Sequence, residues 1–474
     1  MIIKENQDEI LSYLEDSSNF KSGKCDRVFI PENEDEVVEI VNSCNEKNIP
    51  LTVSGGGTGT VGGRIPTEGS IISVERLNRI ISIDEKKAVL EAGTIVNNFL
   101  KEADIIKKFY PPFPTERNAF IGGNTSTNAS GEYSFRFGAT RRYILKVRMV
   151  TGSGKIIEVP RGKYFADTDG IIKTDFVSLK IPSYRTPPIK CSAGYFSADR
   201  MDLIDLIIGS EGTLGVITQV EVALIDKLPD RFIMILFLPS EEKMFEFLWQ
   251  VKKDFISDMY TLEFFDRESL FFLKNDFPEI PDDCCAFYIE STDTTELMEK
   301  WLEISEKYQA KDVWVGGDPK SYQRLIDFRH KLPENINAYF RKLNITKISL
   351  DIAVPENNFR ELVAFYRKFS KESGIRTVLF GHIGENHLHF NLFPVDEREK
   401  NLARQIYLSC VEKAISLGGT ISAEHGIGKI KYPYLRMMYG DNGIRDMIRI
   451  KKIFDPKGLI GRDNLFPAKL IFEQ

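Results

Sequence analysis

Residues 51–69 read LTVSGGGTGTVGGRIPTEG. A short strand-like run, Leu51–Val53, leads into a loop with six glycines between Gly55 and Gly63. Glycines let successive backbone N–H groups turn toward one concavity, which forms an anion-binding nest. Ordering so many glycines costs conformational entropy, and a bound group can compensate for it. We therefore expect a phosphate cradle here, with a flexible hairpin loop as the alternative.

The segment Gly57–Gly62 also matches the dinucleotide fingerprint GxGxxG. That fingerprint requires a helix to begin inside the motif, because the helix N-terminus holds the pyrophosphate. The residues that follow, Gly63–Gly69, include Pro66 and cannot form a packed crossover helix. The sequence thus argues against a Rossmann domain and against a purely NAD-dependent dehydrogenase.

Two more glycine-rich segments follow in the chain. Residues 121–131 read IGGNTSTNASG, and residues 209–218 read GSEGTLGVIT before a strand-like run. Small residues, amides and hydroxyls in such segments permit close approach of the backbone to a flat ligand. Each segment alone is also compatible with an ordinary turn.

In this order, the three segments resemble the FAD domain of the vanillyl-alcohol-oxidase flavoprotein superfamily. They are most similar to the group of glycolate oxidase large subunits, D-lactate dehydrogenases and D-2-hydroxyglutarate dehydrogenases. The group's pattern RGGGTG…GGA, IGGN…N.GG and GSEGTLGV is met over nearly the whole first half. Ser54 replaces the usual Arg, and Arg64 replaces a small residue, but neither change removes a backbone donor.

The resemblance implies FAD, with its pyrophosphate on the first loop, its flavin along the second, and the third near the flavin or adenosine. All five histidines lie after residue 329, so the FAD domain's loop offers no histidyl attachment and non-covalent FAD is expected. The residues expected to bind FAD are Ser54, Gly55, Gly56, Gly57, Thr58, Gly59, Gly62, Pro114, Thr115, Gly122, Gly123, Asn128, Gly131, Gly138, Glu211, Gly212, Gly215 and Ile217.

A chain of 474 residues exceeds the usual size of one hydrophobic core, which favours two domains. We expect an α+β protein. The resemblance implies a PCMH-type FAD-binding domain of two subdomains over residues 1–228, completed by residues 430–474. A ferredoxin-like antiparallel sheet would form the substrate (cap) domain over residues 229–429. Residues 161–185 are polar and irregular, which predicts a surface excursion.

Apolar spacing predicts where several helices and strands lie. Helices are expected over residues 34–47, 241–253, 294–308, 321–342 and 357–373, and strands over 49–53, 71–74, 88–91, 214–225, 232–238, 262–265, 285–290, 348–354 and within 377–393.

Composition narrows the classes of partner. The net charge of −6, without a long Lys/Arg block, disfavours nucleic acid. Six scattered cysteines without CxxC predict reduced thiols in a cytoplasmic protein and place any iron–sulfur relay on another chain. No apolar run approaches the roughly 20 residues of a membrane span, and the acidic N-terminus does not resemble a signal peptide. Peripheral docking onto a membrane-bound partner and homodimer formation stay open.

Four of the five histidines lie in two glycine-rich segments of the second half. Residues 381–391 read GHIGENHLHFN, and residues 424–428 read EHGIG. Imidazoles and carboxylates suit a divalent metal such as zinc or manganese. A lone histidine is more often a packed or surface residue than a ligand. If Leu388 lies in a strand, His387 and His389 share one face.

These segments also resemble the group's second domain, which carries GH.GDGNLH and.EHGIG. The resemblance implies that His382, His389 and Glu424 bind the metal and that His425 is the general base. Periodicity instead favours the pair His387 and His389. His387 stands where the group has Asn, and it is open whether it is an added metal ligand or a substrate contact.

Arg329 stands where the group places the arginine that grips the substrate carboxylate, a role that suits a planar guanidinium. An arginine on a helix surface is the alternative. Lys347 is a weaker substrate candidate, because the group's lysine aligns better with Ser349. The C-terminal segment 454–459 reads FDPKGL and matches the group, whereas residues 461–464 depart from it.

The expected reaction is oxidation of a small 2-hydroxy acid of the glycolate, D-lactate or D-2-hydroxyglutarate class. Hydride would pass from the substrate Cα to flavin N5, while a metal lowers the hydroxyl pKa and His425 takes the proton. Electrons would leave to an iron–sulfur subunit, an electron-transfer flavoprotein or a quinone system. The alternatives are an alkylglycerone-phosphate-synthase-like FAD enzyme and a flavin-binding subunit of an electron-transfer complex.

Overall fold

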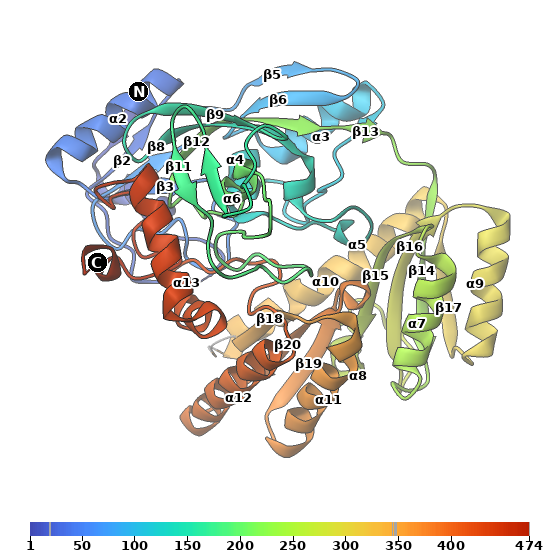
Figure 1. Ribbon diagram of the computed structural model, residues 1–474. Coiled ribbons are helices and arrows are strands. Elements are labelled where there is room, and N and C mark those ends of the chain that lie inside the picture. The colour runs from blue at the N-terminus through green and yellow to red at the C-terminus, as the bar shows by residue number, and fades with distance from the viewer. Residues whose placement is uncertain (19, 344, 346–347, 474) are drawn as a thin grey trace.

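The computed structural model describes residues 1–18, 20–343, 345 and 348–473. It is an α+β fold with two sheet-centred regions that lie side by side (Figure 1). The N-terminal region holds the smaller sheets, and residues from Arg231 onward build one large antiparallel sheet. This confirms the expected fold class.

The N-terminal region contains a four-stranded and a five-stranded sheet. In the first, β4 pairs in parallel with both β2 and β3, and in the second all pairs are antiparallel. The strand orders are β1 (Ile2–Lys4), β2 (Arg27–Ile30), β4 (Ser70–Ser73), β3 (Leu51–Ser54), and β5 (Ile80–Ile83), β6 (Lys87–Glu91), β12 (Gly215–Ala223), β8 (Ile144–Thr151), β9 (Ile156–Pro160). The helices of this region are α1 (Gln7–Ile10), α2 (Glu34–Lys47), α3 (Val96–Ile105), α4 (Ile121–Thr127), α5 (Ser134–Phe137) and α6 (Leu203–Ile207).

Helix α2 spans residues 34–47, over which the apolar spacing predicted a helix, and its contacts show why that prediction was correct. The side chain of Asn33 caps its start by accepting a hydrogen bond from the Glu36 N–H. The apolar residues Val37, Ile40 and Val41 recur at helical spacing and are buried.

The second region is built on a seven-stranded sheet in which all pairs are antiparallel. Its order is β17 (Asp312–Gly316), β14 (Arg231–Leu238), β16 (Cys285–Thr292), β15 (Met259–Phe265), β19 (Arg376–Gly381), β20 (His387–Phe393), β18 (Ile348–Ala353). Its helices are α7 (Met244–Phe255), α8 (Arg267–Phe271), α9 (Thr295–Lys307), α10 (Pro319–Leu343), α11 (Glu356–Glu372) and α12 (Glu397–Ser416).

Both faces of this sheet are covered by helices. Successive residues of β14 enter different cores: Phe232 and Met234 join one cluster, Ile233 and Ile235 the other. Side chains alternate between the faces of a strand, so burial of both faces requires a continuous apolar run rather than alternation. The run at 232–238 has that form.

The chain's last segment returns to the N-terminal region. Helix α13 (Tyr432–Phe454) lies beside it (Figure 1), and α14 (Lys469–Phe472) follows. The Leu51 N–H donates to Leu459 O, and the Gly461 N–H donates to Leu51 O, each at 2.9 Å. Residues 424–428, which precede α13, contact both regions: the Ile427 N–H donates to Glu211 and the His425 N–H donates to Asp351.

Two expectations need correction. The excursion at 161–185 is not wholly irregular: β10 (Ile171–Lys173) and β11 (Ser178–Lys180) form a hairpin that buries Ile172 and Leu179. The strand expected over 214–225 ends at Ala223, and Ile225–Asp226 (β13) instead pairs with β7 (Lys108–Phe109). None of the helices in the described part of the chain has the length and apolar character of a membrane span.

Candidate active site

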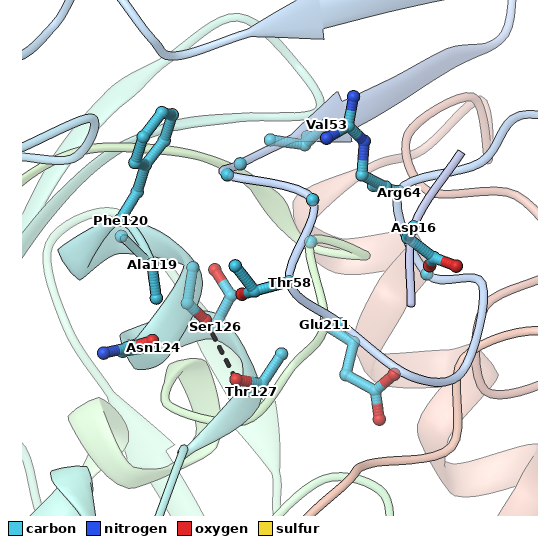
Figure 2. Close-up of a pocket in the computed structure, with 18 of the residues that line it drawn as sticks. Asp16, Val53, Thr58, Arg64, Ala119, Phe120, Asn124, Ser126, Thr127 and Glu211 are labelled. Atoms are coloured by element: carbon cyan, nitrogen blue, oxygen red, sulfur yellow. Dashed lines mark hydrogen bonds between the residues drawn. The ribbon is translucent and has the colours of Figure 1, made fainter. Parts of the chain in front are cut away.

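The three glycine-rich segments line one open cavity (Figure 2). They come from the loop between β3 and β4, from α4, and from the turn before β12. The residues expected to bind FAD that line it are Gly55, Gly56, Gly57, Thr58, Gly59, Gly122, Gly123, Glu211, Gly212 and Ile217.

The first loop is free of helix throughout residues 55–69, all of which are described. Gly57 and Gly62 have φ values of 77° and 71°, which only glycine adopts readily. A Cβ at Gly59 or Gly123 would meet nothing within 4 Å, so the backbone there faces open space. The loop therefore has the form of a cradle with exposed backbone and not that of a Rossmann turn.

The other residues expected to bind FAD do not line this cavity. Asn128 Oδ1, for example, accepts a hydrogen bond from the Arg141 N–H at 3.0 Å. A Cβ at Gly138 would lie 2.8 Å from Arg142 Cδ. Cofactor contacts of these residues stay predictions: Ser54, Gly62, Pro114, Thr115, Asn128, Gly131, Gly138 and Gly215.

Glu211 connects the cavity to the histidine segment. Its carboxylate accepts hydrogen bonds from the Ile427 N–H (2.8 Å) and the Gly428 N–H (2.7 Å). Burial raises the pKa of Glu211 to about 7, although these two donors oppose the shift. The contact holds residues 424–428 against the cavity, and His425 is part of the cavity lining.

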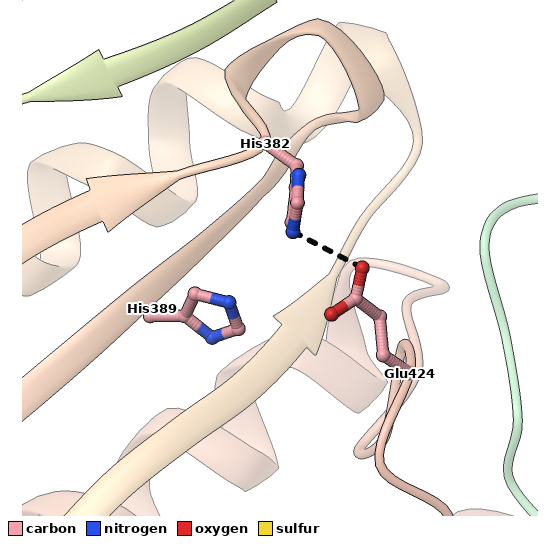
Figure 3. Close-up of side chains that lie close together, drawn as sticks. All are labelled: His382, His389 and Glu424. Carbon is pink, nitrogen blue, oxygen red and sulfur yellow. Dashed lines mark ion pairs between the residues drawn. The ribbon is translucent and has the colours of Figure 1, made fainter. Parts of the chain in front are cut away.

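The residues expected to bind a metal come together beside this cavity. Donor atoms of His382, His389 and Glu424 all lie within 4.8 Å of one another, and His382 Nε2 is 3.1 Å from Glu424 Oε1 (Figure 3). His382 follows β19, and His389 is on β20. Glu424 raises the pKa of His382 to about 9, although burial of the imidazole opposes this rise.

Asp351, on β18, holds the segment 424–428 by accepting hydrogen bonds from its backbone. Its strand pairs with β20 so that Asp351 lies opposite His389. Burial would raise the pKa of Asp351, but neighbouring His425 and Lys431 hold it well below its usual range. The donors to its carboxylate are the Glu424 N–H (3.1 Å), the His425 N–H (3.0 Å), Ser422 Oγ (2.7 Å) and Lys431 Nζ (2.9 Å).

His425 Nδ1 lies 3.3 Å from Asp351 Oδ2. The His425 ring stacks beside that of His389, with centroids 5.6 Å apart. Burial lowers the pKa of His425 and that of His389, so both imidazoles are held neutral near pH 7.

His387 and His389 are both on β20, two residues apart, as the sequence predicted. The His387 side chain is fully buried, with Nε2 3.2 Å from Asp351 Oδ1. Its Nδ1 lies 3.9 Å from Glu424 Oε1.

Arg329 is buried on α10, which excludes the alternative of a helix-surface arginine. Its Nε and Nη2 donate to Glu263 Oε1 at 2.9 and 2.6 Å, and its Nη1 lies 3.7 Å from Glu132. The guanidinium is thus already engaged by carboxylates. Lys347 lies outside the described residues.

Sequence reasoning missed Lys190, whose side chain is only 5% exposed. Lys190 Nζ donates to Glu385 at 2.7 Å and to Ser134 Oγ at 3.0 Å, and it pairs with Glu424. A lone lysine in an irregular segment carries no signal of this role. The sequence does contain such a signal for Asp351, because an acidic residue inside the apolar run ISLDIA requires buried partners.

The charges around the donor cluster do not balance within the chain. The linked groups comprise five carboxylates, three cations and His382, whose raised pKa keeps it protonated, which leaves one negative charge. If a metal took the place of the His382 proton, two negative charges would face it. Buried charges of one sign require compensation. A divalent cation at the donors fits both the charge and the residue types. The carboxylates are those of Glu132, Glu263, Glu385, Glu424 and Asp351, and the cations are Arg329, Lys190 and Lys431.

Matches to two family models define the class of this protein, an FAD-linked oxidoreductase. Residues 25–160 match the FAD binding domain family, and residues 229–465 match the family of FAD linked oxidases, C-terminal domain. The chain therefore belongs to the FAD-linked oxidase family.

The chain is similar to curated relatives over most of its length. It is 30% identical over 459 residues to the glycolate oxidase subunit GlcD of Bacillus subtilis (strain 168), covering 93% of this chain and 89% of that protein. It is 28% identical over 460 residues to a D-lactate dehydrogenase of Anaerostipes hadrus, covering 93% and 88%. Among solved structures, p-cresol methylhydroxylase with substrate bound shares the fold, with a TM-score of 0.71 at 12% identity over 98% of this chain and 94% of that one.

Proposed function

We propose that this protein oxidises a small 2-hydroxy acid of the glycolate, D-lactate or D-2-hydroxyglutarate class to the 2-oxo acid. The observation that carries the proposal is the position of His425. It lines the cavity formed by the FAD segments, and its ring stacks on His389 of the donor cluster. This position supports His425 as the base between the flavin site and the donor cluster. The names of the relatives support the substrate class.

His425 is the proposed general base for the hydroxyl proton. Burial keeps its imidazole neutral, so it has a lone pair to accept that proton. The contact of Nδ1 with Asp351 directs Nε2 away from the carboxylate and stabilises the imidazolium that forms.

His382, His389 and Glu424 are the proposed ligands of a divalent metal such as zinc or manganese, and the excess of carboxylates over cations around them supports this assignment. When bound, such a metal would lower the pKa of the substrate hydroxyl, and non-covalent FAD would supply the hydride acceptor, N5. The protein's part is to hold the Cα–H toward the flavin.

The substrate carboxylate needs a cation, and Arg329 is the proposed one. Its Nη1 is not bonded to Glu263, and it lies 3.7 Å from Glu132, which a substrate carboxylate would have to replace. Lys190, which faces the donors from the N-terminal region, is a second candidate. His387 is kept as a residue of the same cluster, and its role is taken up below.

The two other functions lack support of this kind. An alkylglycerone-phosphate-synthase-like enzyme, which runs no net redox reaction, has no use for the metal donor set. A purely flavin-binding subunit has no use for a base held by a buried aspartate.

We propose a cytoplasmic location, supported by six free cysteines. The proposed electron acceptor is separate: an iron–sulfur subunit, an electron-transfer flavoprotein or a quinone system.

The test is His425→Ala, assayed by anaerobic flavin reduction with a panel of 2-hydroxy acids. Loss of a general base lowers the rate by about 10²–10⁴-fold, while FAD content stays that of the wild type. Undiminished flavin reduction by every acid that reduces the wild type would remove His425 from the proposal.

A further inference from the structure

We infer that His387 Nδ1 is a fourth protein ligand of the divalent cation, beside His382, His389 and Glu424. The inference rests on the proposed function, because it assumes that these three residues hold a cation. It adds a third imidazole to the donor set and links that set directly to Asp351.

The first argument is the direction of the two ring nitrogens. His387 Nε2 lies 3.2 Å from Asp351 Oδ1, and Nδ1 lies 3.9 Å from Glu424 Oε1. A proton on Nε2 is favoured by the Asp351 carboxylate, which leaves the Nδ1 lone pair facing the donor cluster. Metal-binding histidines commonly place their second ring nitrogen against a carboxylate in this way.

The second argument is burial without a partner. The His387 side chain has no exposed surface, and in the described part of the chain neither ring nitrogen completes a hydrogen bond of good geometry. A buried nitrogen without a partner carries the full desolvation penalty of the group. A cation at the donors satisfies Nδ1, and its charge strengthens the Nε2–H donation to Asp351.

The third argument is that the His387 ring lies beside the rings of the other imidazoles. The donor atoms that all lie within 4.8 Å of one another are those of His382, His389 and Glu424, so binding through His387 requires its ring to move toward them. The His387 ring centroid lies 4.7 Å from that of His389 and 5.4 Å from that of His382. His387 and His389 point from the same face of β20 because they are two residues apart. The set becomes three imidazoles and one carboxylate, which favours zinc or cobalt over the oxygen-preferring manganese. The substrate oxygen would then enter as a fifth ligand.

Asp351 then serves two histidines at once. One carboxylate oxygen faces His387 and the other faces His425. Cation binding and the orientation of the base are therefore coupled through one buried side chain.

The experiment is a Co²⁺ titration of FAD-loaded, chelator-treated protein. Absorbance is followed in the red, beyond the flavin bands, where four-coordinate Co²⁺ absorbs far more strongly than six-coordinate Co²⁺. The variant is His387→Asn, and the matched control is His330→Asn, at the one histidine outside the two segments. We expect intense bands for the wild type and the control. For His387→Asn we expect weak bands and an affinity lower by at least about 10-fold.

Equal spectra and affinities for His387→Asn and the wild type overturn the inference and leave the three-ligand site intact. A wild type that binds no Co²⁺ instead rejects the metal of the proposed function, and the inference falls with it. If His387→Asn does not fold, X-ray absorption at the zinc edge of the wild type decides: three imidazole ligands support the inference, and two overturn it.

Discussion

The substitution Asp351→Asn tests whether the buried carboxylate of Asp351 positions His425, the proposed base. The substitution keeps the shape of the side chain but removes its charge, and the amide cannot accept from every group that now donates to Asp351. Lys431 Nζ, 2.9 Å from Asp351 and buried, loses its counter-charge. Breaking a buried pair on one side costs about 3–5 kcal/mol, which sets the expected loss of stability.

The effect on chemistry is separate from that loss. His425 Nδ1 loses the carboxylate that selects its tautomer and stabilises its protonated form. In a serine-protease triad, the equivalent Asp-to-Asn change lowers the rate by about 10⁴-fold. For Asp351→Asn we expect flavin reduction slowed by about 10²–10⁴-fold at unchanged FAD content.

The assay is stopped-flow anaerobic flavin reduction, with thermal melting measured in parallel. Asp266→Asn is the matched control, since Asp266 is equally buried but pairs with Arg367 and caps α8. We expect it to destabilise the protein and leave the rate of flavin reduction unchanged. A rate for Asp351→Asn within a factor of about ten of the wild type (about 1.4 kcal/mol) refutes the reasoning.

Three further predictions address the cavity and its charges. Gly123→Val is expected to lower FAD content without lowering the melting temperature of FAD-free protein, because a Cβ there meets no protein atom within 4 Å; normal FAD content would contradict this. Burial raises the pKa of Glu211 to about 7, so the folded state holds this proton more tightly than the unfolded state. Stability of FAD-free protein therefore falls by about 3 kcal/mol as pH rises from about 4.5 to 7; Glu211→Gln should lose this dependence, and melting profiles identical to those of the wild type would count against it. Lys190→Met removes the cation paired with Glu424, so Co²⁺ affinity should rise by about tenfold, and a lower affinity would show that Lys190 does not compete with the metal.

The glycine loop and the helix at 34–47 were predictable because their signals are local. Backbone freedom, capping and apolar spacing all lie within a few residues. The helices α12 and α13 were not predicted. Helix α13 is interrupted at Gly440, whose φ of 68° is not helical, and such a break obscures the periodicity.

The site was predictable only where chemistry-bearing residues cluster in sequence. His382, His389 and Glu424 stand in recognisable segments, and the structure brings their donor atoms together. Lys190 reaches the same cluster from a distant irregular segment through tertiary packing. The position of Arg329 was predicted, but its engagement with Glu263 depends on the pairing of a helix with a strand 66 residues earlier.

The central claim is that the FAD cavity and the donor cluster act together on a 2-hydroxy acid. The most direct measurement is anaerobic bleaching of the bound flavin against a panel of D- and L-2-hydroxy acids, with and without chelator. The account predicts that at least one acid of the glycolate, lactate or 2-hydroxyglutarate class bleaches the flavin and that chelator slows the reaction until metal is restored. Full reduction by dithionite with no bleaching by any acid of the panel would contradict it.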